Sequence, residues 1–197
     1  MVKALVVSVH PRTDSLTAAA LERALATLRD GRHTVTLIDL YAEGFDPLLS
    51  EDEHRRHRDP PGTKPQIADH VALVRACEML VLVYPTWWGA QPAMLKGWFE
   101  RVWVNGVAAE VHDDGRPPSP LLTNIKRIVV VTTHGSPKWI NAVEGEAGKR
   151  FAKRSLRASV NRRCRVHWIA FYGVDRSTHE RRTRFLDRVS RRLARIV

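Results

Sequence analysis

Cysteine is nearly missing from the chain: Cys77 and Cys164 are the only two among its 197 residues. They lie far apart and form no CxxC pair and no zinc-ligand spacing, so free thiols in a core are expected rather than a disulfide or a metal site. Long apolar runs are missing as well, since no stretch reaches the roughly 20 residues that a membrane helix needs. The opening "MVKALVVSV" carries no signal-peptide cleavage pattern. A soluble cytoplasmic protein without membrane insertion is therefore expected.

Acidic residues are scarce: 21 Asp and Glu stand against 32 Lys and Arg, which gives a net charge of +11. Clustered basic residues can neutralise phosphates, so this balance invites a nucleic-acid interpretation. Much of the excess, however, lies in residues 149–165 and 176–197, where arginines alternate with apolar residues as on the solvated face of an amphipathic helix. We therefore predict no nucleic-acid partner. The basic surface can still help to attract an anionic dinucleotide such as NADPH.

Apolar runs alternate with helical patterns along the chain, and this alternation predicts the fold. Strands are expected at residues 3–9, 34–40, 79–85, 127–133 and 165–173. Helices are expected at residues 16–30, 67–77, 92–102 and 146–160 and over the arginine-rich end, with Phe185, Leu186, Val189, Leu193 and Ile196 on one face. Five buried strands alternating with helices argue for a parallel sheet covered on both faces. We predict one doubly wound α/β domain over residues 1–197, with strand order 2-1-3-4-5.

Ligands of such a sheet bind beyond the carboxyl ends of the strands, near the switch between strands one and three. After the first strand comes "HPRTDSLT", a loop that feeds a helix N-terminus and offers unpaired N–H groups to a phosphate. His10, Ser15 and Thr17 could complete the cradle. The alternative is that Asp14 or Ser15 only caps the helix. No GxGxxG or GxxxxGK[ST] pattern is present here, so neither a Rossmann dinucleotide site nor a P-loop is predicted.

Two further strand ends point to the same place. The third strand ends in "YPTWWGAQP", in which Trp87 and Trp88 offer large aromatic faces next to backbone groups. As an isolated pair, these indoles could equally fill the core or a dimer interface. Trp98 and Phe99 belong instead to the buried stripe of the following helix. The fourth strand ends in "TTHGSPKW", a backbone-rich loop able to hydrogen-bond the edge of a planar heteroaromatic ring.

Together the three strand ends predict a site for a phosphorylated planar ring system, which is a flavin, because strands one, three and four are neighbours in the proposed order. The one long irregular segment, residues 42–66, exceeds the usual loop length. It is expected to form a rim or a dimer contact.

The residues also resemble a known family. "PTWWGAQPAMLKGWFERVW" is similar to the PxxWxxxPAxLKGWxxRVx signature of the flavodoxin-like NAD(P)H:quinone oxidoreductases, which include DT-diaphorase, bacterial modulators of drug activity and ancillary oxidoreductases of potassium-efflux systems. "HPRTDSLTAAAL", "GFDPLLS" and "VVVTTHGS" resemble further family segments in the right order. The resemblance covers residues 3–175. It implies a flavodoxin-like fold, a flavin, NADPH or NADH as co-substrate, a quinone or similar small-molecule acceptor, and a homodimer with the active site at the subunit interface.

Positions carry over from the family segment by segment. The flavin phosphate and ribityl segment corresponds to His10, Ser15, Leu16 and Thr17, and the loop under the ring to Pro85, Thr86, Trp87, Trp88 and Gly89. The loop along the pyrimidine edge corresponds to Thr132, Thr133, Gly135 and Ser136. Trp103 and residues 104–120 could contribute at the subunit interface.

The chain departs from the family in one functional pair. His134 stands where the family commonly has a glycine, which places a titratable ring near the expected flavin edge. In the mammalian enzymes a Tyr and a His assist charge development, and the matching positions here are Trp139 and Gly145. That acid–base pair is therefore absent. His134 is the candidate for adjusting protonation, and Trp139 a candidate for the substrate slot.

The predicted reaction is hydride transfer from NAD(P)H to flavin N5, followed by two-electron transfer to an acceptor that occupies the same slot, which implies ping-pong kinetics. FMN is favoured over FAD because no clear adenine site is visible. One alternative is an electron carrier of the flavodoxin type, although such carriers look strongly acidic and this chain is basic. Another is a regulatory flavoprotein subunit of a membrane potassium-efflux system, for which the basic C-terminal helix is the only candidate docking surface.

Overall fold

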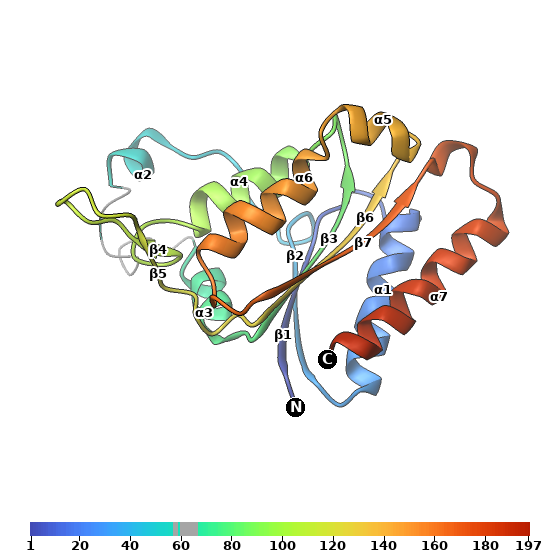
Figure 1. Ribbon diagram of the computed structural model, residues 1–197, viewed down its shortest axis with the longest axis horizontal. Coiled ribbons are helices and arrows are strands. Elements are labelled where there is room, and N and C mark those ends of the chain that lie inside the picture. Colours follow the sequence, from blue (N-terminus) through green and yellow to red (C-terminus); the bar gives the residue numbers. More distant parts are fainter. Residues whose placement is uncertain (57–58, 60–66) are drawn as a thin grey trace.

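A five-stranded parallel sheet forms the centre of the molecule (Figure 1). The computed structural model describes residues 1–56, 59 and 67–197. The sheet order is β2-β1-β3-β6-β7, which is the order predicted from the sequence when the strands are counted along the sheet. Its strands are β1 (Lys3–Ser8), β2 (Thr34–Asp39), β3 (Met79–Thr86), β6 (Arg127–His134) and β7 (Arg165–Tyr172). A separate antiparallel ribbon pairs β4 (Ala109–Glu110) with β5 (Ser119–Pro120).

Helices cover both faces of the sheet (Figure 1). The pair α1 (Leu16–Asp30) and α7 (His179–Ile196) lies on one face. The other face carries α3 (Ala68–Ala76), α4 (Ala93–Val102) and α6 (Ala147–Arg150), which continues as the π-helix η3 (Phe151–Leu156). Short helices α5 (Lys138–Val143) and η4 (Val174–Arg176) lie beyond the carboxyl ends of β6 and β7, and α2 (Glu51–Arg55) lies at the side of the molecule. This arrangement is the predicted doubly wound α/β fold.

Burial is deepest in the three central strands, because each of them is covered on both faces. The prediction that all five strands are buried was wrong for the two edges. Only Ile38 of β2 and only Ile169 and Phe171 of β7 are fully buried, and the rest of each edge strand is half-buried or exposed. On α7, Phe185, Val189 and Leu193 form the buried stripe expected from their spacing.

The edge strand β7 is closed by arginine side chains of α7. The guanidinium of Arg188 donates to the carbonyl oxygen of Ala170 at 2.7 Å, and that of Arg181 donates to the carbonyl oxygen of Tyr172 at 3.3 Å. Arg188 also lies over the Phe185 ring, with its guanidinium carbon 5.4 Å from the ring centroid. The basic side chains of α7 therefore have structural partners on this side of the helix and are not only a solvated face.

The segment expected to be irregular, residues 42–66, contains the helix α2. Ser50 caps this helix, since its hydroxyl accepts from the Glu53 N–H at 3.1 Å while the Glu53 carboxylate accepts from the Ser50 N–H at 3.1 Å. Such a capping box, with Ser followed three residues later by Glu, was readable in the sequence. Residues 57, 58 and 60–66 of the same segment lie outside the described part of the chain.

Glu53 also ties α2 to α4. Its carboxylate accepts two hydrogen bonds from the Arg101 guanidinium at 2.8 and 2.9 Å, and Arg101 donates a further one to the carbonyl oxygen of Asp46 at 2.5 Å. The two side chains are only 8% and 12% exposed. The guanidinium and the Ser50 N–H hold the pKa of the Glu53 carboxyl below its usual value, against the opposing effect of burial.

The glycine of the LKGW segment has a packing role. A Cβ atom on Gly97 would lie 2.2 Å from the carbonyl oxygen of Pro47, which no real structure permits. Trp98 and Phe99 next to it are buried, as predicted. The loop after β2 therefore crosses α4 at the one position where the helix lacks a side chain.

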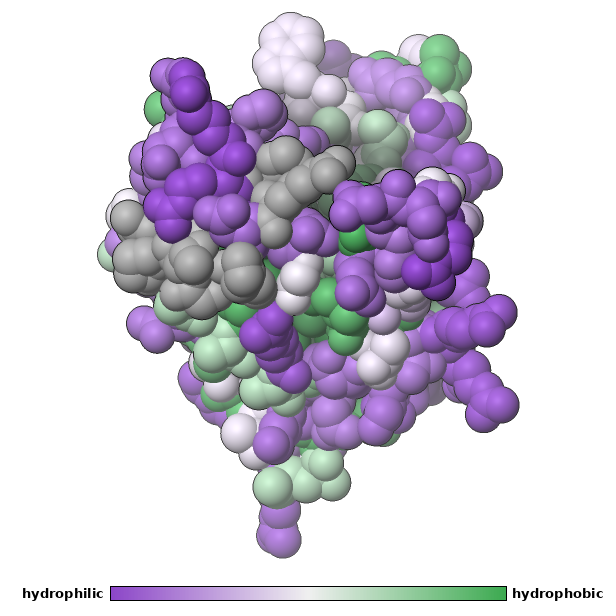
Figure 2. All heavy atoms as spheres, turned by 90° about the vertical axis from the view of Figure 1, so that its left-hand side faces the viewer, coloured by the Kyte–Doolittle hydropathy of each residue, from purple (hydrophilic) through white to green (hydrophobic). Residues whose placement is uncertain are grey.

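The remaining sequence expectations concern the thiols and the surface. Cys77 and Cys164 are free and buried, as predicted. Among the helices of the described residues, none is long and apolar enough to cross a membrane. Figure 2 shows that the side of the molecule bearing α2 and the β4–β5 ribbon is mostly hydrophilic, with hydrophobic atoms exposed only in small groups.

Candidate functional site

One cavity of about 960 Å³ lies beyond the carboxyl ends of β1, β3 and β6. It gathers almost all of the residues that the sequence singled out. From that set its lining contains His10, Ser15, Leu16, Thr17, Pro85, Thr86, Trp87, Trp88, Gly89, Thr133, His134, Gly135 and Ser136. Strands β1, β3 and β6 are neighbours in the sheet, so loops far apart in sequence meet here.

The first wall is the N-terminus of α1. Ser15 is the N-cap, and its hydroxyl accepts from the Ala18 N–H at 3.0 Å. The capping role that the sequence left open is therefore real, and the same residue also faces the cavity. The first turn of α1 holds no acidic residue. The positive end of a 15-residue helix thus opens toward the cavity, and Asp14 just before it is paired with Arg12.

The second wall is a tight turn at the end of β3. Trp87 and Ala90 exchange both backbone hydrogen bonds at 3.1 Å, with Trp88 at φ +50° and Gly89 at φ +74° between them. Two consecutive positive φ values define the type I′ hairpin turn, which normally holds Asn-Gly. Trp88 is fully exposed and Trp87 is 42% exposed. The alternative that these indoles fill the core was therefore wrong, whereas an interface role stays open.

Hydroxyl groups join the three loops at the floor of the cavity. The Thr17 and Thr133 hydroxyl oxygens are 2.8 Å apart, which connects α1 to the end of β6. The Thr86 and Thr132 hydroxyl oxygens are 3.0 Å apart, which connects β3 to β6. Thr132 is completely buried beneath this bond and does not line the cavity. Its position therefore supports the floor, and a direct contact of Thr132 with a ligand stays a prediction.

His134 is buried at the end of β6, with its ring stacked on Tyr172 at a centroid distance of 4.4 Å. Its Nδ1 lies 2.6 Å from the Asn141 side-chain oxygen. Asn141 uses its amide N–H to donate to the Pro137 carbonyl at 3.0 Å, so its oxygen is the acceptor for an Nδ1–H of His134. Nε2 then carries the lone pair and faces the Thr86 hydroxyl at 3.4 Å.

Burial lowers the pKa of His134, and the hydrogen bond to Asn141 and the charge of Glu146 oppose that shift. The imidazole is therefore neutral near pH 7 and keeps one defined tautomer. A neutral ring with a free Nε2 lone pair beside a hydroxyl can accept and return a proton at the cavity floor.

Several lining residues were missed by the sequence reasoning. Arg12, Asn141, Glu144, Val174, Asp175 and Arg182 also line the cavity. Val174 and Asp175 come from the connection between β7 and α7, and Arg182 from the first turn of α7, so a fourth strand end of the same sheet contributes. The rule that ligands bind at carboxyl ends would have included them had it been applied to the last strand. Asn141 gave no sequence signal, because its role depends on the short helix α5.

Two aromatic residues that the sequence singled out lie outside the lining of this cavity. Trp139, the candidate for the substrate slot, does not line this cavity but an adjoining one between α5 and α7. Trp103 packs against the core of its own chain, and its indole N–H donates to the Ser159 hydroxyl at 2.7 Å. Trp103 is half-buried, and its contribution at a subunit interface stays a prediction.

The residues present fit a phosphorylated planar ring system. The α1 N-terminus offers unpaired N–H groups, and Arg12 and Arg182 add positive charge to the lining. Gly89 and Gly135 line the cavity without side chains, and a Cβ on Gly135 would lie 3.0 Å from an Asp175 carboxylate oxygen. A phosphate at α1 and a ring against the Trp87–Gly89 turn are thus compatible with this cavity.

Comparison with known proteins agrees with this geometry. A family model described as the flavodoxin-like fold matches residues 2–196. The chain is 37% identical over 100 residues to YcaK, an uncharacterized NAD(P)H oxidoreductase of Escherichia coli K12. The aligned region covers 50% of this chain and 51% of that protein. It is 31% identical over 153 residues to NAD(P)H dehydrogenase [quinone] 1 of Cavia porcellus. This aligned region covers 68% of the chain and 54% of that protein.

A solved structure matches over nearly the whole length. Smu.1420 from Streptococcus mutans UA159 superposes with a TM-score of 0.88 at 27% identity and covers 98% of this chain and 99% of its own. The two curated relatives are matched over only about half of their length.

Proposed function

Because the chain belongs to the family with the flavodoxin-like fold, we propose that its 197 residues act as one flavin-dependent NAD(P)H:quinone oxidoreductase domain. The observation that carries the proposal is the convergence of three strand-end loops on one cavity, with a helix N-terminus, an exposed indole pair and a buried imidazole around it. The names of the curated relatives support the same reaction class.

The β1–α1 loop holds the phosphate in this proposal. Ser15, Leu16 and Thr17 place their backbone N–H groups at the positive end of α1, and His10 closes the loop beside Trp87, with ring centroids 6.3 Å apart. Arg182 supplies a second charge from the other side of the cavity. Among the described residues this cavity offers one phosphate cradle, at the N-terminus of α1. FMN, with a single phosphate, is therefore favoured, and FAD is the alternative.

The Trp87–Gly89 turn and the loop from Thr133 to Ser136 hold the ring. When bound, a flavin takes a hydride from a nicotinamide and passes two electrons to an acceptor such as a quinone. The rigid type I′ turn fixes the height of the ring, and the Gly135–Ser136 backbone lies where its polar edge would be hydrogen-bonded. NADPH and NADH are both candidate donors, and donor and acceptor would use one slot in turn.

His134 has a proton-transfer role in this proposal. Its Nε2 lone pair faces the Thr86 hydroxyl, and Asn141 fixes the ring by binding Nδ1–H. A proton taken up at Nε2 is stabilised by the Asn141 oxygen and by the Glu146 carboxylate, both of which raise the pKa of His134. The chain would thereby replace the Tyr and His pair that it lacks.

The exposed indoles support a homodimer. Trp88 is fully exposed and Trp87 is 42% exposed, and both lie at the carboxyl end of the sheet. Large apolar side chains in such positions are typical of contact surfaces. A cytoplasmic location and the absence of a nucleic-acid partner stay predictions from the sequence.

The electron-carrier alternative predicts flavin binding without reaction with a nicotinamide. The alternative of a regulatory subunit for a potassium-efflux system predicts a membrane partner. The basic C-terminal helix is its only candidate docking surface, and two of its arginines are engaged with β7. The enzyme proposal is therefore favoured.

The test is an absorbance spectrum of the purified protein, followed by anaerobic addition of NADPH or NADH and then a quinone. The proposal expects a flavin spectrum that bleaches with the donor and recovers with the acceptor, and chromatography of the released cofactor decides between FMN and FAD. A flavin spectrum that neither donor bleaches would favour the carrier. A colourless protein that takes up neither flavin would overturn the proposal.

A further inference from the structure

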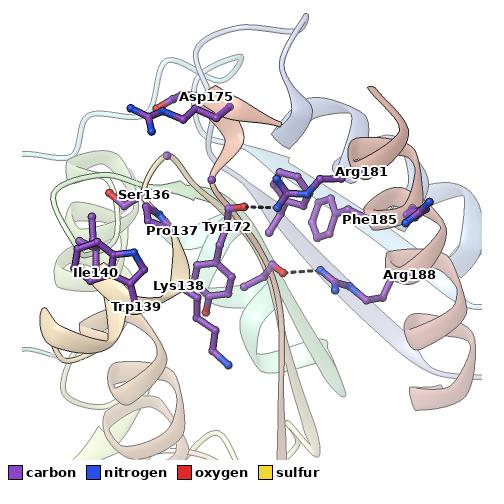
Figure 3. Close-up of a pocket in the computed structure, with 16 residues that line it drawn as sticks. Ser136, Pro137, Lys138, Trp139, Ile140, Tyr172, Asp175, Arg181, Phe185 and Arg188 are labelled. Carbon is purple, nitrogen blue, oxygen red and sulfur yellow. Dashed lines mark hydrogen bonds between the residues drawn. The ribbon is translucent and has the colours of Figure 1, made fainter. Parts of the chain in front are cut away.

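A second cavity of about 1100 Å³ adjoins the first on the side of the sheet edge (Figure 3). We name it the α5–α7 groove. Lys138 and Trp139 of α5 form one side, Arg181 and Arg188 of α7 form the other, and the end of β7 lies between them. Arg184 of α7 also lines the groove. Asp175 and Arg176 of η4 lie at its upper end. Like the first cavity, it is located at the carboxyl ends of parallel strands, where ligands of such sheets bind.

The lining of the groove is strongly basic. It contains the cations Lys138, Arg176, Arg181, Arg184 and Arg188 and a single acidic residue, Asp175. A concave surface that carries charge of one sign focuses the field and raises the local concentration of ions of the opposite sign. The ligand that complements this groove is therefore an anion with more than one negative charge.

Two of the arginines are held in place. Arg181 and Arg188 each donate one hydrogen bond to a backbone carbonyl of β7, which fixes the guanidinium and leaves further N–H groups for a ligand (Figure 3). Burial and the nearby charge of Arg192 lower the pKa of Arg188, because the two guanidinium groups repel each other. Arg184 forms an exposed ion pair with Glu180, one turn earlier on α7. A phosphate would relieve this repulsion and form charge-assisted hydrogen bonds.

The groove also offers an aromatic surface. Trp139 lines it with its indole 68% exposed. Tyr172 lies between the two walls (Figure 3). An exposed indole beside guanidinium groups is the combination that holds a purine ring next to a phosphate.

The groove is continuous with the proposed flavin cavity. Gly135, Ser136 and Asp175 line both of them. One elongated ligand can therefore reach from the first cavity across this rim into the groove. A dinucleotide has the required shape, with a ring at each end and anionic phosphates between them.

We propose that the α5–α7 groove binds the adenosine 2′-phosphate end of NADPH and thereby makes NADPH the preferred donor over NADH. The inference rests on the proposed function, because it places the nicotinamide end of the same molecule in the first cavity. Arg176 and Arg184 are the specificity-determining residues, since both are exposed in the groove and neither holds the edge of β7. An acidic peptide could complement the same charges but has no reason to follow the rim into the first cavity.

The test is the double variant Arg176→Gln/Arg184→Gln, compared with the matched control Arg191→Gln/Arg195→Gln, which removes two charges from exposed positions of α7 outside the groove. In the groove variant KM for NADPH should rise about tenfold while KM for NADH changes by less than about twofold. The control should shift neither KM by more than about twofold. Equal changes for both donors, or no change for either, would overturn the proposal.

A binding measurement separates this proposal from the reaction itself. Titration calorimetry of the purified protein with adenosine 2′,5′-bisphosphate should give saturable binding that the groove variant loses and the control retains, whereas adenosine 5′-monophosphate should bind at least about tenfold more weakly. If the bisphosphate binds but neither NADPH nor NADH bleaches the protein, the proposed function is wrong and the groove is still a nucleotide site. If both donors bleach the flavin but the bisphosphate does not bind, the groove proposal alone is wrong. The same holds if a poly-glutamate peptide displaces the bound bisphosphate from the groove.

Discussion

His134 and Asn141 are joined by a hydrogen bond of 2.6 Å between Nδ1 of the imidazole and Oδ1 of the amide, and both side chains are buried. This contact decides which nitrogen of His134 faces the cavity. It comes from two elements that are separate in the sequence pattern, the end of β6 and the short helix α5. Asn141 is therefore a positioning residue for any proton transfer by His134.

Replacing Asn141 should shift the pKa of His134 in a direction set by the replacement. Asn141→Leu removes a contact that raises the pKa, so the pKa should fall further, whereas Asn141→Asp keeps the acceptor and adds a negative charge, so it should rise. Two-dimensional nitrogen–proton NMR of the imidazole measures both the pKa and the tautomer. Shifts in the same direction in the two variants would refute this account of the site.

Stability should decrease on acidification below the ordinary histidine range. Burial lowers the pKa of both His134 and His167 from 6.5, so the unfolded chain binds protons before the folded one does. Stability from these residues is fully present above pH 6.5 and is lost as the pH falls toward the folded pKa values. Urea midpoints at about pH 7.5 and about pH 5.5 measure the effect. The difference should shrink in His134→Gln/His167→Gln, and an unchanged difference in that variant would assign it to other groups.

Gly97→Ala should destabilise the protein by about 2 kcal/mol, because the added methyl group overlaps the backbone of another segment. The obstacle is the Pro47 carbonyl oxygen, 2.2 Å from the position of the new Cβ, and it cannot rotate away as a side chain could. Lys96→Ala on the exposed side of α4 is the control and should change the unfolding free energy by less than about 0.5 kcal/mol. Equal urea midpoints for the two variants would contradict the packing argument.

Arg101→Leu should cost about 3 kcal/mol of unfolding free energy, since it leaves the Glu53 carboxylate without its partner at a largely buried position. Arg116→Leu removes an exposed ion pair with Asp114 and serves as the control, with an expected loss below about 0.5 kcal/mol. Chemical denaturation compares them. A loss in Arg101→Leu no larger than in the control would show that the α2–α4 link contributes little.

Trp88→Asn should raise stability and lower ligand binding at the same time. A bulky residue at φ +50° is strained, and Asn before Gly89 is the preferred occupant of this turn, so a gain of about 0.5 to 1 kcal/mol is expected. The substitution also removes a fully exposed indole from the cavity rim, so added FMN should bind more weakly. Denaturation and flavin titration measure the two effects. A destabilised variant would show that the Trp88 ring contributes packing that outweighs the strain.

Much of the fold was predictable because local patterns of apolar residues indicate the strands and helices. Runs such as residues 79–85 and 127–133 are continuously apolar, and central parallel strands are the structures that bury such runs on both faces. The order of the strands followed from their number and alternation with helices. The two edge strands were predicted as well, but their half-burial was missed, because it follows from their place in the sheet and not from their own sequence pattern.

The candidate site was predictable where it lies on strand ends and not where it depends on packing between short elements. His10 and Trp87 follow strands, so the topology brings them together. Asn141 and Trp139 belong to α5, a helix of 6 residues that carries no periodic signal of its own. Only its position against β7 shows that one residue binds His134 and the other faces the groove.

The arginines that close β7 have a consequence for the behaviour of the protein at high concentration. An outer strand with open carbonyls is a template on which a strand from another molecule can add, and such addition starts ordered aggregates. Arg181 and Arg188 occupy the carbonyls of Tyr172 and Ala170, and they surround that edge with positive charge that repels a second copy. The arginines of α7 thus hinder the addition of further strands at the β7 edge of the sheet.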